Sequence, residues 1–380
     1  MLRETVYTNA RVVTRDAVFN GSVRAVDGRI ASIDEGPTQL SAAIDIEGDF
    51  LIPGLIDLHT DTLEHHLEPR PGVRWPVMAA LMMHDRQIAA AGITTVFDSL
   101  CVGDFDNGTV GRRDALVNSL EALERAQSDG LLKADHLFHL RCEVTSVAIV
   151  ESFLMFVDDP LVRLVSVMDH TPGQRQWSNL DKWRQFNSRR NVSRAELNVI
   201  LETRQRNQAR YAGANRAEVV RLSKERGLPL ASHDDTTPEH VEEAIADGVT
   251  ISEFPTTEDA ARIARENKLH VVMGSPNVVM GGSHSGNVSA GALAEAGLVD
   301  GLASDYVPLS LLHAAFLFHE DLDIALPQAI ATVTSNPAEM VGLDDRGTID
   351  IGKRADLVWV KSYEHAPVCR GVWRAGEHVA

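Results

Sequence analysis

Cysteine is scarce in this chain of 380 residues, which has only Cys101, Cys142 and Cys369 and no CxxC pair. An odd, scattered count gives no disulfide framework and is typical of a reducing compartment. Long apolar runs are also missing. No segment approaches the roughly 20 residues that span a bilayer, and the beginning, MLRETVYTNARVV, lacks the apolar stretch of a signal peptide. We therefore expect a cytoplasmic protein that has no membrane contact.

Positive charge is also in short supply. The chain has 36 Lys and Arg against 54 Asp and Glu, a formal net charge of −18 at pH 7. Non-specific nucleic-acid binding needs a basic face, so this balance argues against a nucleic-acid partner. A small phosphorylated substrate is still compatible with it, because a pocket can be locally basic and because metal-binding carboxylates add to the negative total.

Short β-strands are indicated at both ends of the chain. Alternating or β-branched segments lie at residues 6–13, 22–26 and 29–33, then at 347–352, 355–360 and 372–379. Asp27-Gly28 and Ala375-Gly376 are turn signals between such segments. We predict that residues 1–52 and 345–380 form one small discontinuous β-sandwich domain, which brackets a central domain of residues 53–344.

The central part has a different rhythm, in which short apolar runs alternate with polar clusters and helical patterns. The runs lie at residues 51–58, 93–99, 137–142, 161–168, 228–232, 249–254, 269–274 and 301–304. Continuous apolar runs flanked by helices are typical of parallel strands buried on both faces. Eight of them predict an α/β fold of the (β/α)8 type, a TIM-like barrel. An open doubly wound sheet is the alternative.

One connection, residues 172–226, is unusually long, polar and rich in Arg, Gln and Asn. We expect helices that extend over a mouth of the barrel. A solvated helical insertion without a catalytic role is equally compatible with the composition.

Polar residues follow the apolar runs at the end where such barrels carry their active sites. His59 and Asp61 end the first run in the sequence LIPGLIDLHTD. Residues two apart on a strand point to the same side, so both can reach one metal ion near the barrel axis. His-x-Asp alone is a weak signal, and its position at a strand end favours metal binding over a surface turn.

Further metal-ligand candidates end other runs. Glu143 follows the third run, where a carboxylate can bridge two divalent ions; an ion pair with Arg141 is the alternative. His233 ends the fifth run, where an imidazole beside carboxylates suits zinc, unless it is a hydrogen-bonded core histidine. Glu253 is a carboxylate of the sixth run that would need a cation if buried. His170, after the fourth run, competes for the metal or the substrate.

Asp305 closes the last run and is the candidate general base. A carboxylate beside metal-bound water can take its proton, and Asp305 is also a candidate metal ligand. The alternative is an N-cap for the helix expected at residues 309–318.

A Gly-rich loop, GGSHSGN, occupies residues 281–287 after the seventh run. Such a loop can hold a phosphate with backbone N–H groups, although it lacks the P-loop pattern and a flexible loop is the alternative. The candidate substrate-binding residues are Ser283, His284, Ser285, Asn287, Arg70, Arg175 and His170.

Several segments together resemble a known family. LIPGLIDLHTD, the discontinuous β domain and GTIDIGKRADLVWV resemble the amidohydrolase superfamily. HTDTLEHHLEPRPGVRWP, HLRCE, SVMDHTPGQRQ, ASHDD, EFPTT and GSPNVVMGGSHSGN are similar to one branch of it, which acts in phosphonate metabolism. The superfamily usually begins its site with His-x-His and often uses a carboxylated lysine as a bridge. Here Asp61 replaces the second histidine, Glu143 is the natural substitute for the lysine, and Glu253 stands where a histidine often occurs.

The resemblance implies a metal-dependent diphosphatase. It would cleave the 5-triphosphate of a ribosyl methylphosphonate to pyrophosphate and a 5-phosphoribosyl phosphonate, which the C–P lyase pathway enzymes would use. The implied cofactor is a divalent metal, with zinc as the expected ion, in one or two copies. On this hypothesis, metal-activated water attacks phosphorus and Asp305 takes its proton.

Two other functions stay open at the level of the sequence. One is hydrolysis of an amide, as in most of the superfamily, and the other is a non-catalytic barrel that serves as a binding or scaffold protein. A homo-oligomer is also compatible with the sequence.

Overall fold

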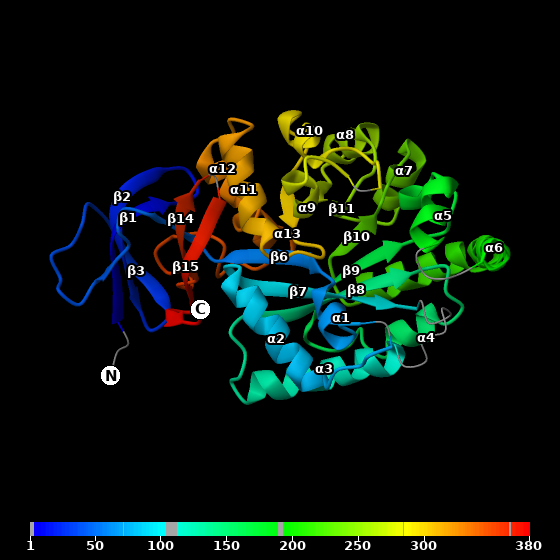
Figure 1. Cartoon of the computed structure of the whole chain (residues 1–380), viewed down its shortest axis with the longest axis horizontal. Coiled ribbons are helices and arrows are strands. Elements are labelled where there is room, and N and C mark those ends of the chain that lie inside the picture. The colour runs from blue at the N-terminus through cyan, green and yellow to red at the C-terminus, as the bar shows by residue number, and fades with distance from the viewer. Residues whose placement is uncertain (1–3, 71, 104–111, 189–192, 284, 365) are drawn as a thin grey trace.

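The computed structural model describes residues 4–70, 72–103, 112–188, 193–283, 285–364 and 366–380. Two lobes are visible in Figure 1: a sheet built from both ends of the chain, and a barrel of strands surrounded by helices. The first described strand and the last strands of the chain both belong to the sheet lobe, as expected if the two ends of the chain build it together.

The strands of the smaller lobe are hydrogen-bonded in the order β16-β15-β14-β5-β1-β2-β3, with β4 paired to β1. They are β1 (Glu4–Val13), β2 (Val18–Val26), β3 (Arg29–Glu35), β4 (Ile44–Asp45), β5 (Phe50–Pro53), β14 (Leu357–Tyr363), β15 (Ala366–Arg374) and β16 (Glu377–His378). β5 joins the two halves, because it pairs with β1 in parallel and with β14 in antiparallel fashion. The predicted discontinuous β domain is confirmed, and its hydrogen bonding runs through one sheet.

The larger lobe is a parallel barrel whose strands pair in chain order from β6 to β13. They are β6 (Leu55–Thr60), β7 (Ile93–Val102), β8 (Asp135–Glu143), β9 (Val162–Met168), β10 (Leu230–His233), β11 (Ile251–Glu253), β12 (His270–Gly274) and β13 (Gly301–Ala303). The ring closes where Thr60, at the end of β6, pairs in parallel with Asp305, just after β13. The predicted (β/α)8 fold is confirmed.

Helices surround the barrel strands (Figure 1). They are α1 (Thr62–Leu67), α2 (Val77–Ala90), α3 (Arg112–Ser128), α4 (Ile149–Leu154), α5 (Leu180–Ser188), α6 (Arg194–Glu225), α7 (Pro238–Ala246), α8 (Glu258–Glu266), α9 (Ser275–Val279), α10 (Ala290–Glu295), α11 (Ser310–Glu320), α12 (Leu326–Ala331) and α13 (Ser335–Met340). The predicted helical insertion contains the short 3₁₀ helix η1 (Arg175–Trp177), α5 and α6. α6 starts with a capping box between Ser193 and Glu196 and packs against α4 and β9.

The first apolar run is two strands rather than one. β5 belongs to the terminal sheet and β6 to the barrel, with Gly54 between them. A Cβ atom on Gly54 would lie 2.2 Å from Thr94 Oγ1 and 2.9 Å from Asp356 Cβ. Only glycine fits where the two lobes meet this closely. The pattern of apolar residues in the sequence does not reveal that contact.

The prediction of a strand at residues 347–352 is wrong, because this segment forms turns. Gly347 and Gly352 have φ angles of +88° and +89°, in the region that favours glycine. Ile349 is fully buried, whereas Ile351 is 69% exposed. The alternating pattern reflects one inward side chain in a turn and not a strand.

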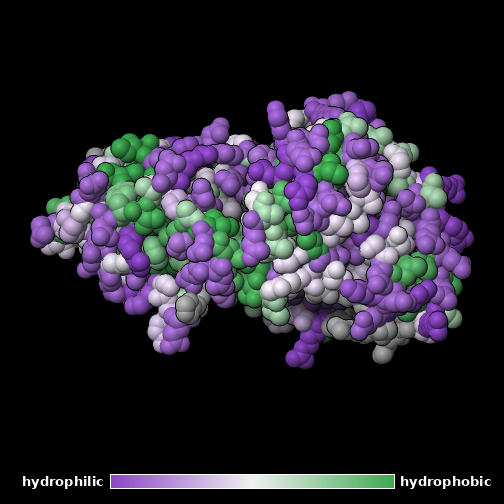
Figure 2. All heavy atoms as spheres, turned by 90° about the horizontal axis from the view of Figure 1, so that it is seen from above, coloured by the Kyte–Doolittle hydropathy of each residue, from purple (hydrophilic) through white to green (hydrophobic). Residues whose placement is uncertain are grey.

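Hydrophilic side chains cover most of the face seen in Figure 2, and apolar ones gather in small groups. Among the helices formed by the described residues, none combines the length and apolar character that crossing a membrane requires.

We predict that Gly54→Ala destabilises the fold by about 1–3 kcal/mol, because the added methyl group overpacks the contact between the lobes. Gly213→Ala is the matched control, since Gly213 lies in α6 and an added Cβ atom there would meet no atom within 4 Å. That change should stabilise the fold by about 0.5–1 kcal/mol. Urea unfolding curves measure both, and equal stability of the two variants would contradict the prediction.

Candidate active site

Buried polar side chains mark the C-terminal ends of the barrel strands. His59 lies near the end of β6, and Glu143, His233 and Glu253 are the last residues of β8, β10 and β11. Active sites of (β/α)8 barrels are built at this end. The structure thus brings these predicted residues to one end of one barrel, and Asp305 joins them directly after β13.

Glu253 connects two histidines from different strands. Its Oε1 lies 2.7 Å from His59 Nδ1, and its Oε2 lies 2.9 Å from His233 Nδ1. The two imidazole rings are nearly parallel, with centroids 5.7 Å apart. Burial alone would raise the pKa of Glu253, but the neighbouring His59, His139 and His233 lower it well below its ordinary value. An ionised Glu253 therefore orients both rings through Nδ1 and leaves their Nε2 atoms for a ligand.

A second convergence of nitrogen and oxygen atoms includes His170 and Asp234. His170 Nδ1 lies 3.0 Å from Glu143 Oε2, while His170 Nε2 and His233 Nε2 each lie 3.5 Å from Asp234 Oδ2. These two Nε2 atoms and the Asp234 oxygen are a possible metal-ligand group. The sequence pointed to His170 and His233, but not to Asp234. Asp234 has a φ of +57°, a conformation that sequence patterns do not reveal.

Asp305 is fixed by the backbone of the first barrel strand. Its N–H donates to His59 O at 2.9 Å, and its carbonyl accepts from Asp61 N at 3.0 Å and from Thr60 Oγ1 at 3.0 Å. Its φ of +55° is unusual for a residue other than glycine. Asp305 does not act as the helix N-cap, because α11 begins at Ser310 with Leu309 as its N-cap. Burial, and next the carboxylate of Asp61, raise the pKa of Asp305 to about 7.

His139 is a site residue that the sequence analysis missed. Its Nδ1 lies 3.0 Å from Leu58 O, 3.1 Å from Ser99 Oγ and 3.9 Å from Glu253 Oε1. Burial lowers the pKa of His139 to about 3, so the ring is neutral. His139 lies in the middle of β8 and not at its end, which is why a search of strand ends overlooked it. Its spacing of four residues from Glu143 was the available signal, since alternate residues face the barrel interior.

The unpaired buried atoms of this region fit a divalent cation. Within the described parts of the chain, Asp61 Oδ1 and His139 Nε2 are buried without a hydrogen-bond partner, and Asp234 Oδ2 has only its two imidazole contacts at 3.5 Å. A buried polar atom left unpaired costs about 1–3 kcal/mol. Imidazole nitrogens and carboxylate oxygens together suit zinc and similar ions.

Three of the six predicted ligands fall in groups that could hold such an ion: His59 and Glu253 with His139, and His233 with His170 and Asp234. Asp61, Glu143 and Asp305 stay predicted ligands. Glu143 and Glu253 both contact imidazole groups here. Their role as direct ligands stays a prediction.

The predicted substrate-binding arginines lie in very different surroundings. Arg175 is buried, and its Nη1 lies 2.6 Å from Asp235 Oδ1 and 3.1 Å from the carbonyl oxygen of His233. It thus supports the backbone behind His233. Arg70 is exposed in the segment between α1 and α2.

Several backbone N–H groups of the Gly-rich loop already donate hydrogen bonds within the protein. The N–H groups of Gly281, Gly282 and Gly286 donate to carbonyl groups, and Ser285 N donates to Ser283 Oγ. Phosphate binding by these N–H groups would first have to break those bonds, so side chains are the better candidates. Lys182 on α5 reaches this loop, with its Nζ 3.0 Å from Ser285 O. Asn287 is half-buried in the same loop, and His284 lies outside the described residues. The substrate-binding roles stay predictions.

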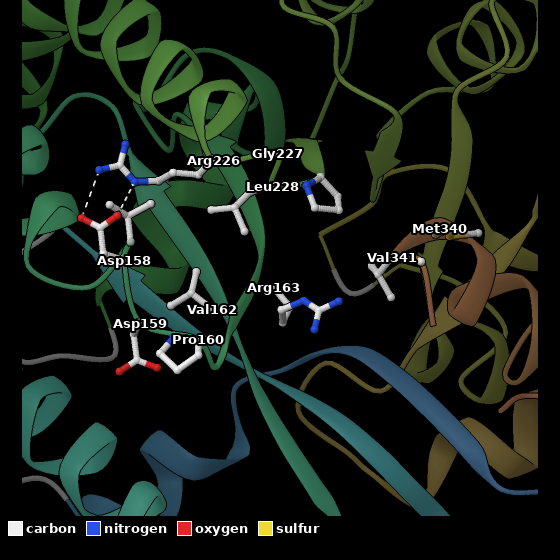
Figure 3. A pocket seen from close by; sticks show the side chains of 13 residues that line it. Asp158, Asp159, Pro160, Val162, Arg163, Arg226, Gly227, Leu228, Met340 and Val341 are labelled. Atoms are coloured by element: carbon white, nitrogen blue, oxygen red, sulfur yellow. Dashed lines mark hydrogen bonds and ion pairs between the residues drawn. The ribbon is translucent and has the colours of Figure 1, made fainter. Parts of the chain in front are cut away.

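A cavity of about 580 Å³ lies at the opposite end of the barrel, where β9 and β10 begin (Figure 3). Arg163 lines it and points toward Val341, while Arg226 is paired with Asp158. This end of a (β/α)8 barrel contributes mainly to stability, and the predicted ligand residues are all at the other end.

Comparison with known proteins agrees with this architecture. A model of the amidohydrolase family matches residues 194–380, and a full-length relative supports the same assignment. The chain belongs to the amidohydrolase family and is a hydrolase. The full-length relative is the alpha-D-ribose 1-methylphosphonate 5-triphosphate diphosphatase of Escherichia coli (strain K12). The two are 42% identical over 377 residues, which cover 98% of this chain and 100% of that protein.

Solved structures with much lower identity share the fold. A 5-methylcytosine deaminase from Klebsiella pneumoniae has a TM-score of 0.67 at 14% identity, covering 100% of this chain and 98% of that one. An N-acetylglucosamine-6-phosphate deacetylase from Pasteurella multocida has a TM-score of 0.64 at 12% identity, covering 100% of both chains.

A second buried polar cluster lies between α2, β7 and β8. Asp98 Oδ1 is 2.6 Å from His84 Nε2, and Asp98 Oδ2 is 2.8 Å from His136 Nδ1. His136 Nε2 is 3.2 Å from Asp85 Oδ1. Burial would lower the pKa of His136, but Asp98 and Asp85 raise it to about 9. The cluster is therefore an ion pair network whose hydrogen bonds satisfy its own charges.

We predict that this cluster makes stability depend on pH. The folded-state pKa of His136 is raised from 6.5 to about 9. Its contribution is therefore fully present below pH 6.5 and is lost as the pH rises through about 9. The free energy of unfolding should fall by on the order of 1–3 kcal/mol over that window.

Urea unfolding at about pH 6 and about pH 9.5 measures the change, and His136→Gln should remove most of it. His65→Gln, on the exposed side of α1, is the control and should keep the wild-type dependence. The same pH dependence in both variants would show that His136 is not its source.

Proposed function

We propose that this protein hydrolyses alpha-D-ribose 1-methylphosphonate 5-triphosphate to 5-phospho-alpha-D-ribose 1-methylphosphonate and pyrophosphate. The observation that carries the proposal is the similarity to the diphosphatase from Escherichia coli, at 42% identity over 98% of this chain and 100% of that protein. The strand-end cluster of imidazoles and carboxylates supports it, because it suits metal-dependent hydrolysis.

The proposed cofactor is one or two divalent cations, with zinc favoured by the mixture of nitrogen and oxygen donors. The proposed ligands are His59, Asp61, Glu143, His233, Glu253 and Asp305. Such a cation, when bound, supplies Lewis-acid chemistry that activates water and offsets phosphate charge.

Asp305 is the proposed general base. It accepts a proton from the attacking water, the water oxygen forms a bond to phosphorus, and pyrophosphate leaves with the electrons of the broken anhydride bond. A base is most effective when its pKa lies near the working pH, and the surroundings of Asp305 raise its pKa to about 7. Hydrogen bonds to β6 hold its backbone beside His59 and Asp61.

We propose that the reaction belongs to phosphonate metabolism. We propose that the 5-phosphoribosyl phosphonate passes to enzymes that cleave the carbon–phosphorus bond, and that the protein acts in the cytoplasm. The partner in this reaction is thus a small phosphorylated molecule, in agreement with the named substrate of the relative.

Phosphorus NMR of the metal-loaded protein with the triphosphate tests the reaction. We expect equimolar pyrophosphate and a monophosphate product. Removal of the metal with a chelator should abolish the signal of both, and adding zinc back should restore it. Turnover of N-acyl substrates with no release of pyrophosphate would overturn the proposal and favour an amide hydrolase.

We predict that Asp305→Asn lowers kcat at least a hundredfold, because an amide cannot accept the proton. The metal content should stay similar, since His59, Asp61, Glu143 and His233 remain. Asp321→Asn is the matched control, because Asp321 is exposed at the end of the helix that follows Asp305. Its kcat should equal that of the wild type. Full activity of Asp305→Asn would rule out the proposed base.

A further inference from the structure

Arg141 on β8 lies in the active site without a role in the mechanism described so far. His139, Arg141 and Glu143 alternate along this strand, so their side chains share the face that lines the barrel interior. In the parallel pairing, Arg141 stands beside Cys101 of β7 and Ser166 of β9. It lies one inward-facing position closer to the strand end than His139, whose Nδ1 is 3.9 Å from Glu253 Oε1.

The guanidinium group of Arg141 has no hydrogen-bonded partner within the described segments of the chain. Its Nε is buried without a hydrogen-bond partner, and no hydrogen bond or ion pair to Arg141 occurs among the residues that the structure describes. Its two terminal nitrogens are not among the buried unpartnered atoms, so they reach accessible space. Arg175 is the opposite case, because carboxylates and a carbonyl group occupy its nitrogens.

The surroundings of Arg141 are acidic. The ionisable side chains that act on it are those of Cys101, Asp61, Glu64 and Asp305. An arginine is charged at any ordinary pH, and no hydrogen bond joins it to these carboxylates in the described part of the chain. A charged group whose N–H donors have no partner among the described residues is arranged to bind an anion.

We propose that Arg141 binds the phosphoryl oxygens of the triphosphate next to Asp305. The inference rests on the proposed function, because it assigns the substrate anion of that site. A guanidinium offers parallel N–H donors that match two oxygens of one phosphate. The carboxylates of Asp61 and Asp305 repel a polyanion, and the nearby guanidinium of Arg141 offsets this repulsion.

The test compares Arg141→Met and Arg141→Lys with Arg163→Met. Arg163 is an arginine on the neighbouring strand β9, but it lines the cavity at the far end of the barrel (Figure 3). Calorimetric titration of the metal-loaded proteins with inorganic pyrophosphate gives the dissociation constants, and methylphosphonate is the second probe. Metal content, circular dichroism, KM and kcat are measured for each protein.

We expect Arg141→Met to weaken pyrophosphate binding at least tenfold and to raise KM, with an unchanged metal content. Arg141→Lys, which keeps the charge but loses the parallel donors, should fall between Arg141→Met and the wild type. It also serves as the readout if the methionine variant does not fold. Arg163→Met should bind pyrophosphate like the wild type.

Wild-type affinity for pyrophosphate in the folded Arg141 variants would overturn the inference. So would a loss confined to methylphosphonate, because the guanidinium would then serve the other end of the substrate. A different result would contradict the proposed function. If the wild-type protein binds pyrophosphate through Arg141 but does not turn over the triphosphate, the anion site is confirmed and the proposed reaction is wrong.

Discussion

The closure of the barrel between β6 and residue 305 is the constraint on which the site depends. Asp305 N donates to His59 O at 2.9 Å, and Asp61 N donates to Asp305 O at 3.0 Å, so the first and last strands share one register. This register brings together residues that are about 245 positions apart along the chain. A slip of one residue would turn the side chains of β6 to the other face and separate His59 and Asp61 from Asp305. The same hydrogen bonds thus close the fold and define the site.

Charge balance is the second constraint. In the barrel, carboxylates are held by imidazoles: Glu253 by His59 and His233, and Glu143 by His170. These contacts orient the rings, and each of the two buried glutamates has a hydrogen-bond partner. No imidazole of the described residues pairs with Asp61 or Asp305. Burial of Asp305 and repulsion by the Asp61 carboxylate raise the pKa of Asp305. The unpaired oxygens are therefore the part of the site that needs a cation.

Much of this arrangement could be predicted from the sequence, because buried parallel strands produce apolar runs and their ends produce polar residues. His59, Glu143, His233, Glu253 and Asp305 follow from that pattern. Other features depend on contacts between distant segments. Gly54 separates two strands only because Thr94 and Asp356 lie against it. Asp234 reaches His170 through a left-handed backbone. The polar segment around Arg175 predicts a surface residue, yet Arg175 is buried and hydrogen-bonded to Asp235.

The two arginines on neighbouring strands show how position along a strand decides function. Arg163 lies near the beginning of β9, where the surrounding cavity is lined by residues such as Val162 and Val341 and by the paired Arg226. Arg141 lies near the end of β8, close to the acidic side chains of Asp61 and Asp305. Its terminal N–H donors have no partner among the described residues and face accessible space. Acidic groups attract a metal cation but repel a phosphate chain. A site that must bind both needs a fixed positive group that the carboxylates do not neutralise through hydrogen bonds. Cation and polyanion then favour each other's binding, since each reduces the repulsion that opposes the other.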